Sequence, residues 1–225
     1  MREVSIAELI LDFDLYPRTQ IDSSHVRYMR IAHEGGTILP QPIIDKKSKR
    51  VIDGFHRISM YKRIDKSMKI EVIEKNYASD AEMFADAMRL NAHHGRNLSP
   101  FDRAHCIIRA ESLGMTVEQI AGDLSMSVEA IGEMKLEKMG TMRSDGLRVT
   151  IPIKRTIQHM HGRQLTKRQF EANDRLGGMN QMFYVNQLIE LIESDLLDKE
   201  NEDLMARLQV LEDLLKAVIK EYAVV

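Results

Sequence analysis

The chain has 225 residues, 44% of them hydrophobic, which is enough to build one large core or two to three small ones. Its 32 basic and 34 acidic side chains give a net charge of −2, which argues against a uniformly basic nucleic-acid coat. The single cysteine, Cys106, excludes an internal disulfide framework and a cysteine-based zinc site. No apolar run reaches the roughly 20 residues of a membrane helix, and no secretory signal is recognisable. We therefore expect a cytoplasmic protein with no membrane partner.

The first 75 residues mix strand and helix signals, which predicts a small α/β unit. Helices are expected where a capping residue or glycine precedes an apolar stripe, and strands in short β-branched runs bounded by turn residues. The first two strands are separated only by a polar turn, so they should pair as a hairpin. In chain order, the expected elements are a helix over 25–33, strands over 42–45 and 50–53, a helix over 54–64 and a strand over 68–73.

From Ser79 onward the strand signals mostly vanish and helices follow. Ser79 begins a sequence typical of a capping box, and Ser99 precedes a proline suited to the first turn of a helix. Thr116 and Ser127 can each cap a short helix, and the small Ala121 lets these two helices approach closely. The length of this pattern fits a helix-turn-helix, although a plain helical hairpin would give the same signal.

Charge is unevenly distributed along the chain. Residues 141–178 carry eight basic and three acidic side chains, whereas residues 179–225 carry four basic and ten acidic ones. In the basic segment, 149–153 is expected to be extended and Thr166 to cap a helix. One stretch of strongly positive charge between acidic stretches fits a protein with a single anion-facing region.

The last 47 residues predict helices, with the first over 183–197. Apolar side chains then recur at alternating spacings of four and three, which is a heptad seam on one face of a helix. The seam consists of Leu204, Leu208, Leu211, Leu215, Val218 and Tyr222. We expect this acidic helix to form a homodimer, with packing inside the chain as the alternative.

The clearest candidate for a chemical site is the predicted strand–glycine–helix junction at residues 52–57. Backbone N–H groups at a helix start bind anions, and Gly54 would let a phosphate come close. His56 and Arg57 would add charge-assisted hydrogen bonds. Asp53 could hold a ribose hydroxyl or a metal, or cap the helix. A tight strand-to-helix turn with surface charges would give the same pattern.

Several motifs occur in a recognisable order. They are Pro17-Arg18, Gln41-Pro42-Ile43, Gly54-Phe55-His56-Arg57, Leu98-Ser99-Pro100 and the pattern over 116–134. In this order they resemble the ParB/sulfiredoxin-like superfamily, most closely ParB-type DNA-binding proteins of the regulator or phage type, over about residues 1–140.

The resemblance implies an α+β fold, with a small mixed-sheet domain followed by a mainly helical region and a C-terminal amphipathic helix. The parts are then an anion- or nucleotide-binding domain over 1–78, a helix-turn-helix domain over 79–140, the basic segment over 141–178 and a self-association region over 179–225. It implies double-stranded DNA as a partner and a role in DNA partition or transcription regulation.

The resemblance also implies a nucleotide site for CTP or ATP with Mg²⁺. The implied site residues are Arg18, Gln41, Asp53, Gly54, His56, Arg57, Asn91 and Arg96. The alternative is a nucleotide-dependent enzyme of the same superfamily, a CTPase or small-molecule kinase. Phe55 stands where sulfiredoxin has its cysteine, so that reductase chemistry is not expected. No protein metal site is expected, because His93, His94 and His105 lack carboxylates at ligand-like spacing.

The second helix of the helix-turn-helix pattern is unusually acidic for DNA recognition. Glu129, Glu133 and Glu137 face two lysines there, whereas a recognition helix normally carries basic or amide groups. DNA contacts are therefore expected mainly in the basic segment. The predicted DNA-binding residues are Ser127, Lys135, Lys154, Arg155, Arg163, Lys167 and Arg168.

Overall fold

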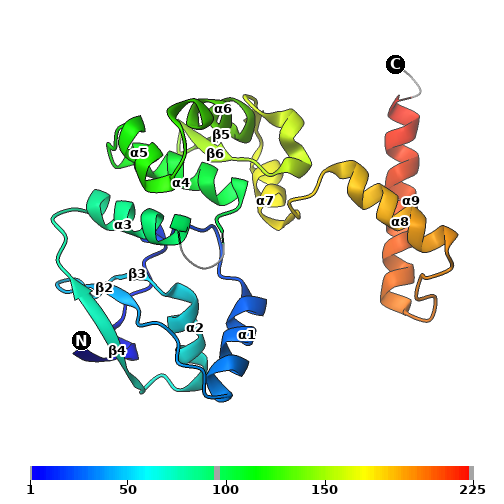
Figure 1. Ribbon diagram of the computed structural model, residues 1–225. Helices are drawn as coiled ribbons and strands as arrows, with labels where there is room; N and C mark the ends of the chain where they lie inside the picture. The colour runs from blue at the N-terminus through cyan, green and yellow to red at the C-terminus, as the bar shows by residue number, and fades with distance from the viewer. Residues whose placement is uncertain (1, 94–96, 223–225) are drawn as a thin grey trace. The chain divides into compact units, whose positions relative to one another are not determined.

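Residues 2–93 and 97–222 are described by a computed structural model, in which the chain divides between residues 178 and 179 into two units (Figure 1). The protein is of the α+β class, as the sequence predicted. No helix in the described residues is long and apolar enough to cross a membrane.

The first unit begins with a four-stranded mixed sheet in the order β1–β4–β2–β3. The predicted hairpin is present as β2 and β3, and β4 runs parallel to β2 and antiparallel to β1. Helix α2 follows β3 directly and packs beside α1. The elements are β1 (Arg2–Ser5), α1 (Ser23–Glu34), β2 (Ile43–Asp45), β3 (Val51–Asp53), α2 (Phe55–Ile64) and β4 (Lys69–Lys75).

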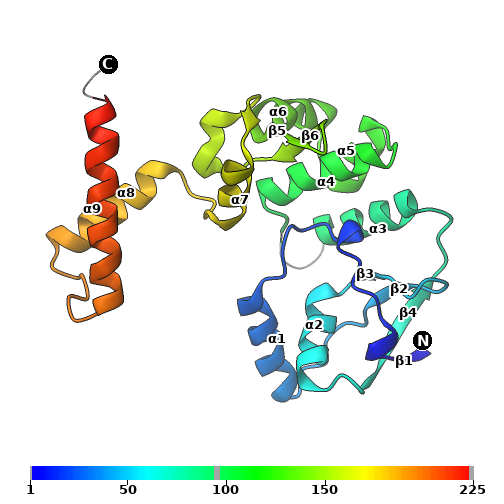
Figure 2. The ribbon, with the colours of Figure 1, turned by 180° about the vertical axis from the view of Figure 1, so that it is seen from behind.

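Four helices follow, and α3 lies between the first sheet and the other three (Figures 1 and 2). They are α3 (Asp80–His93), α4 (Pro100–Ser112), α5 (Val117–Leu124) and α6 (Val128–Lys138). Ser99 and Thr116 form the capping boxes of α4 and α5, and Ser127 caps α6. Residues 125–127 connect α5 to α6, with Ser125 in the left-handed region at φ 52°. The two helices predicted over 116–134 are therefore present.

One apolar core joins these helices to the first sheet. Phe84 on α3 is fully buried, and it belongs to the same cluster as Leu15 and Ile52 from the first 78 residues. Ile120 and Ile131 bring α5 and α6 into that cluster. Burial of this many apolar side chains is the main stabilising term for the unit.

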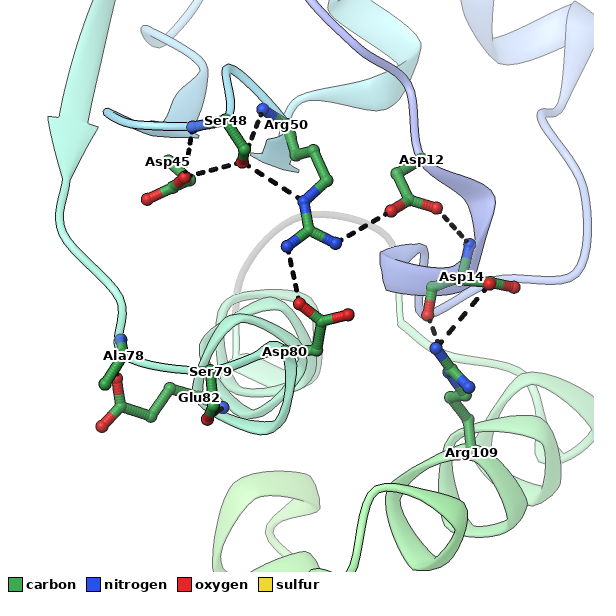
Figure 3. Close-up of polar contacts among 10 residues, drawn as sticks. All are labelled: Asp12, Asp14, Asp45, Ser48, Arg50, Ala78, Ser79, Asp80, Glu82 and Arg109. Atoms are coloured by element: carbon green, nitrogen blue, oxygen red, sulfur yellow. Dashed lines mark hydrogen bonds and ion pairs between the residues drawn. The ribbon is translucent and has the colours of Figure 1, made fainter.

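Ion pairs reinforce the same junction (Figure 3). The Arg50 guanidinium, at the start of β3, lies 3.1 Å from an Asp12 carboxylate oxygen and 2.6 Å from one of Asp80. Arg109 on α4 donates to the backbone oxygen of Asp14 at 3.0 Å. The N-terminal segment is thereby tied to both α3 and α4.

A second, three-stranded sheet follows α6 and was largely missed by the sequence analysis. Its order is β6–β5–β7, with β5 and β6 forming a hairpin. The sequence predicted only 149–153 as extended. The helix predicted after Thr166 is present as α7, with a capping box. The elements are β5 (Met139–Ser144), β6 (Leu147–Pro152), the short helix η3 (Arg155–Met160), β7 (Gln164–Leu165) and α7 (Lys167–Arg175).

The second unit contains two helices, α8 (Gln181–Glu193) and α9 (Glu202–Tyr222). Neither helix has a single buried residue. The predicted seam lies on α9, where Leu204, Leu208 and Leu211 are half-buried, whereas Leu215, Val218 and Tyr222 are 47%, 63% and 84% exposed. The C-terminal half of the seam therefore lies open to solvent in the isolated chain.

The partly buried His105 of α4 predicts how stability depends on pH. Burial lowers the pKa of His105 below its ordinary 6.5, outweighing the hydrogen bond that its ring donates to the Tyr16 backbone oxygen and the charge of Asp102. The unfolded chain binds this proton at a higher pH than the folded chain does. The stability that His105 contributes is therefore fully present above pH 6.5 and is lost as the pH falls from that value through the lower pKa of the folded chain.

We predict that the free energy of unfolding, measured by urea titration, falls from about pH 7.5 to about pH 5.5 and falls less in His105→Gln. The control is His159→Gln, which removes an exposed histidine and should keep the wild-type pH dependence. Equal pH dependence in wild type and His105→Gln would contradict the assignment.

Candidate functional site

A cavity of about 740 Å³ opens at the start of α2, a size typical of small-ligand sites. Its walls come from the loop before β2, the junction of β3 with α2, and the end of α3. It brings together seven of the predicted site residues, and the eighth, Arg96, lies outside the described residues. The seven are Arg18, Gln41, Asp53, Gly54, His56, Arg57 and Asn91.

Gly54 forms the floor of this junction and has a backbone that requires glycine. Its φ is +105°, in the left-handed region that other residues adopt only with strain. A Cβ atom there would lie 3.0 Å from the Pro42 Cβ and 3.2 Å from the Arg57 Nε. Among the described residues no side chain caps α2, so the backbone N–H groups of its first turn remain the natural donors for an anion.

Arg57 is buried and already bonded to the protein. Its Nη1 donates to the backbone oxygens of Pro40 and Gln41, at 2.5 and 3.1 Å. Its Nη2 lies 2.5 Å from the carboxylate of Asp53, four residues earlier. Arg57 therefore holds the 40–41 loop against α2, and its charge is balanced by Asp53.

Arg18 connects the cavity to α4. The Arg18 Nη1 donates to the backbone oxygen of Asn97 at 3.3 Å and lies 3.9 Å from the Asp102 carboxylate. The Cys106 thiol donates to the backbone oxygen of Pro17 at 3.2 Å, and burial raises the pKa of that thiol. The thiol is thus a buried structural group.

His56 faces the cavity but is bonded to the loop before α1. Its Nε2 accepts a hydrogen bond from the Asp22 backbone N–H at 3.2 Å. The Tyr16 hydroxyl lies 3.4 Å from its Nδ1, and the Tyr16 ring stacks on Phe55 with centroids 4.3 Å apart. His25 packs edge-on against His56 at 5.0 Å.

The remaining predicted residues also bond within the protein. The Gln41 amide donates to Glu71 at 2.6 Å, and the Asn91 amide to the Ala87 backbone oxygen at 2.9 Å. Much of the remaining lining is apolar, supplied by Met29, Ile38, Leu39, Ile43, Ile73 and Leu90. The cavity thus suits a ligand with an apolar body and an anionic group at the α2 start.

The side chains that line the cavity give little support to the predicted Mg²⁺ that would accompany a nucleotide. Mg²⁺ takes oxygen ligands, and the cavity's carboxylate, that of Asp53, is paired with Arg57. No group of three or more metal-ligating side chains occurs within residues 2–93 and 97–222. Binding of CTP or ATP stays a prediction.

Three of the predicted DNA-binding residues have structural roles. The Ser127 hydroxyl caps α6 by accepting from the Ala130 N–H at 3.1 Å, and Lys135 is ion-paired with Glu111 on α4. The Lys154 ammonium donates to the backbone oxygens of Asp174 and Leu176, at 2.7 Å each, at the end of α7. Partial burial lowers the pKa of Lys154. Its assignment as a phosphate contact therefore conflicts with its place in the structure.

The other four predicted DNA-binding residues, Arg155, Arg163, Lys167 and Arg168, are exposed. None of them has an ion-pair or side-chain hydrogen-bond partner in the part of the chain that the structure describes. Two more free arginines, Arg143 and Arg148, lie on the β5–β6 hairpin. Both arginines belong to the basic segment in which the sequence predicts DNA contacts, but their place on a hairpin was not predicted, although the Asp145-Gly146 dipeptide between them is a strong hairpin signal.

A second cavity, of about 1030 Å³, was not predicted. It lies between the loop of residues 18–23, the start of α4 and the segments 153–158 and 176–178. Arg155 is one of its lining residues. Residues 18–23 and the basic segment therefore line the same cavity.

No family model matches the sequence, and no curated protein matches it. Solved structures similar to this chain include a C-terminally truncated chromosome-partitioning protein ParB from Caulobacter crescentus, complexed to the centromeric parS site. It is 16% identical and has a TM-score of 0.44, over 60% of this chain and 71% of that one.

Two structures of a pNOB8-like ParB N-domain are also similar, at 15% and 17% identity and TM-scores of 0.42 and 0.39. They cover 66% and 67% of this chain, which spans 56% and 52% of those two chains.

The environment of Arg57 predicts that the residue is structural. Arg57→Met would leave Asp53 unpaired and two carbonyls without donors, and should lower the free energy of unfolding by about 3 kcal/mol. Arg30→Met is the matched control, because Arg30 forms an exposed ion pair with Glu34 at the same spacing. The control should cost less than about 0.5 kcal/mol in the same urea titration. Equal costs for the two variants would refute the structural role.

Proposed function

We propose that the chain is a dimeric DNA-binding protein that acts in DNA partition or transcription regulation. The observation that carries the proposal is a set of exposed cations between Arg143 and Arg168 that have no ion-pair or side-chain hydrogen-bond partner among the described residues. Unpaired arginines and lysines are suited to duplex phosphates, which supply much of the affinity of such complexes. The buried arginines of the first part, by contrast, are bonded to the protein's own groups.

The α5–α6 pair supports this proposal. Two capped helices joined by a tight turn have the form of a helix-turn-helix, in which the second helix enters the major groove. Here α6 exposes Glu129, Glu133 and Glu137, so its contribution would be contact with base edges rather than with phosphates. Cations from outside α6 must then hold the duplex.

The cavity at α2 would bind a regulatory anion, with CTP or ATP as the nucleotide candidates. The uncapped first turn of α2 provides backbone donors for one phosphate group. The apolar lining would suit a base or another flat apolar body. A change in duplex affinity when either nucleotide is added would show that the cavity and DNA binding are coupled.

Self-association through residues 179–225 would account for their exposed apolar surface. Two helices without a buried residue cannot form a stable core alone, and large exposed apolar patches mark interaction surfaces. A second copy offers the same helices and would bury the α9 seam in a symmetric interface.

We predict that Arg163→Gln, Lys167→Gln and Arg168→Gln together weaken binding to a mixed-sequence duplex. The slope of log affinity against log salt should fall by up to about 2.7, since each lost phosphate contact removes about 0.9. The control triple, Arg63→Gln, Lys66→Gln and Lys69→Gln, removes the same charge from exposed positions of the first part.

The control should keep most of the wild-type slope in the same fluorescence-anisotropy titrations. If wild type shows no salt-dependent duplex binding, the proposed function is wrong. If both triples lower the slope equally, residues 163–168 form no local contact.

We also predict that the full chain sediments as a dimer of 25.9 kDa protomers. Leu208→Asp with Leu215→Asp should make it monomeric, because charge would enter the buried seam. Ala206→Asp with Ala217→Asp adds the same charge to the opposite face of α9 and should leave the dimer intact. A monomeric wild type would remove the dimer from the proposal.

A further inference from the structure

The β5–β6 hairpin places two arginines directly opposite each other. Arg143 and Arg148 are register partners, so their side chains lie on the same face of the hairpin. Both are exposed, and within the described part of the chain neither guanidinium has an ion-pair or hydrogen-bond partner. Like charges directly opposite one another destabilise a hairpin, so this pair lowers the stability of the hairpin unless an anion lies between the two side chains.

The turn beyond this pair is well formed, so the arginines are held in a defined position. Asp145 and Gly146 have φ values of 50° and 81°, as in the two-residue turns preferred by hairpins. The base of the hairpin is anchored as well, because the Ile153 N–H donates to the Lys138 oxygen at 2.8 Å. The hairpin is thus a rigid projection with two free cations near its tip.

Strand alternation shows which side of the hairpin the arginines occupy. Met139, Thr141 and Arg143 share one face of β5, and Met139 packs in the core that contains Ile131 of α6. The opposite face carries Met142, which packs in the small cluster with Phe170 of α7. The arginines therefore lie on the face that packs against the core shared by α4 and α6, whereas α7 packs on the other face.

We infer that the β5–β6 hairpin is a wing that grips the sugar–phosphate backbone of duplex DNA beside α6. The inference rests on the proposed DNA binding and names the element that contacts phosphate. Each guanidinium is a planar fork suited to phosphate oxygens, and an anion between the pair would relieve its repulsion. Cations beside α6 would also offset the acidic surface of that helix where the duplex approaches.

The test compares the full chain with Arg143→Gln/Arg148→Gln in binding to a mixed-sequence duplex, between about 50 and about 200 mM salt. The slope of log affinity against log salt should fall by about 2 per chain, because two phosphate contacts are lost. The melting temperature should stay the same or rise, because the repulsive pair is gone. Arg27→Gln/Arg63→Gln is the control and removes the same charge from exposed positions on α1 and α2.

A second variant separates binding from folding. Arg148→Glu places an acid opposite Arg143, so it should raise the melting temperature while weakening duplex binding further. If either wing variant melts well below wild type, the arginines are structural and the inference is overturned.

The binding results have equally definite meanings. If wild type binds with a steep salt dependence and the double variant Arg143→Gln/Arg148→Gln keeps that slope, the hairpin does not contact phosphate. The proposal of DNA binding would then stand, and the inference about the wing would be wrong. If the control lowers the slope as much as the wing variant, the effect is general charge and the wing is again wrong. If wild type binds no duplex, the proposed function itself fails.

Discussion

The shared apolar core around α3 is the constraint on which the rest of the first unit depends. Phe84 is fully buried there, in one cluster with Ile52 of the first sheet and Ile120 of α5. The Arg50 ion pairs reinforce this junction from the polar side. The same helix supplies Asn91 to the cavity wall. The cavity wall and α6 thus belong to one close-packed core. A ligand in the cavity and a duplex on α6 would therefore both contact elements that cannot move independently.

The basic side chains of the two parts of the chain differ in their surroundings, and the net charge does not show this difference. Arg18 and Arg57 are buried and bonded to the protein's own oxygens, so they stabilise the first part. From Arg143 onward most cations are exposed without partners in the described residues, and a near-neutral total hides this contrast. The acidic α6 would repel the phosphates of a duplex. Exposed cations from residue 143 onward could offset this repulsion, whereas the buried arginines of the first part could not.

Local signals predicted the elements that local chemistry controls. The β2–β3 hairpin and the caps at Ser99 and Thr116 depend on nearby residues, and each is where the sequence placed it. The pairing of β1 with β4 depends on residues about 70 positions apart, which no local pattern reveals. The second hairpin does have a local signal at Asp145-Gly146, but its first strand, β5, lacks the regular alternation of apolar and polar residues that predicts a β-strand.

The candidate site shows the same limit. Sequence motifs placed seven residues around one cavity but could not show that Arg57 is committed to Asp53, or Lys154 to the end of α7. Hydrogen exchange of the full chain, with and without a mixed-sequence duplex at low salt, tests the central claim most directly. The account predicts that the duplex slows exchange in α6 and β5–β6 and leaves α1 unchanged. Unchanged exchange over residues 127–152 in a sample saturated with duplex would contradict it.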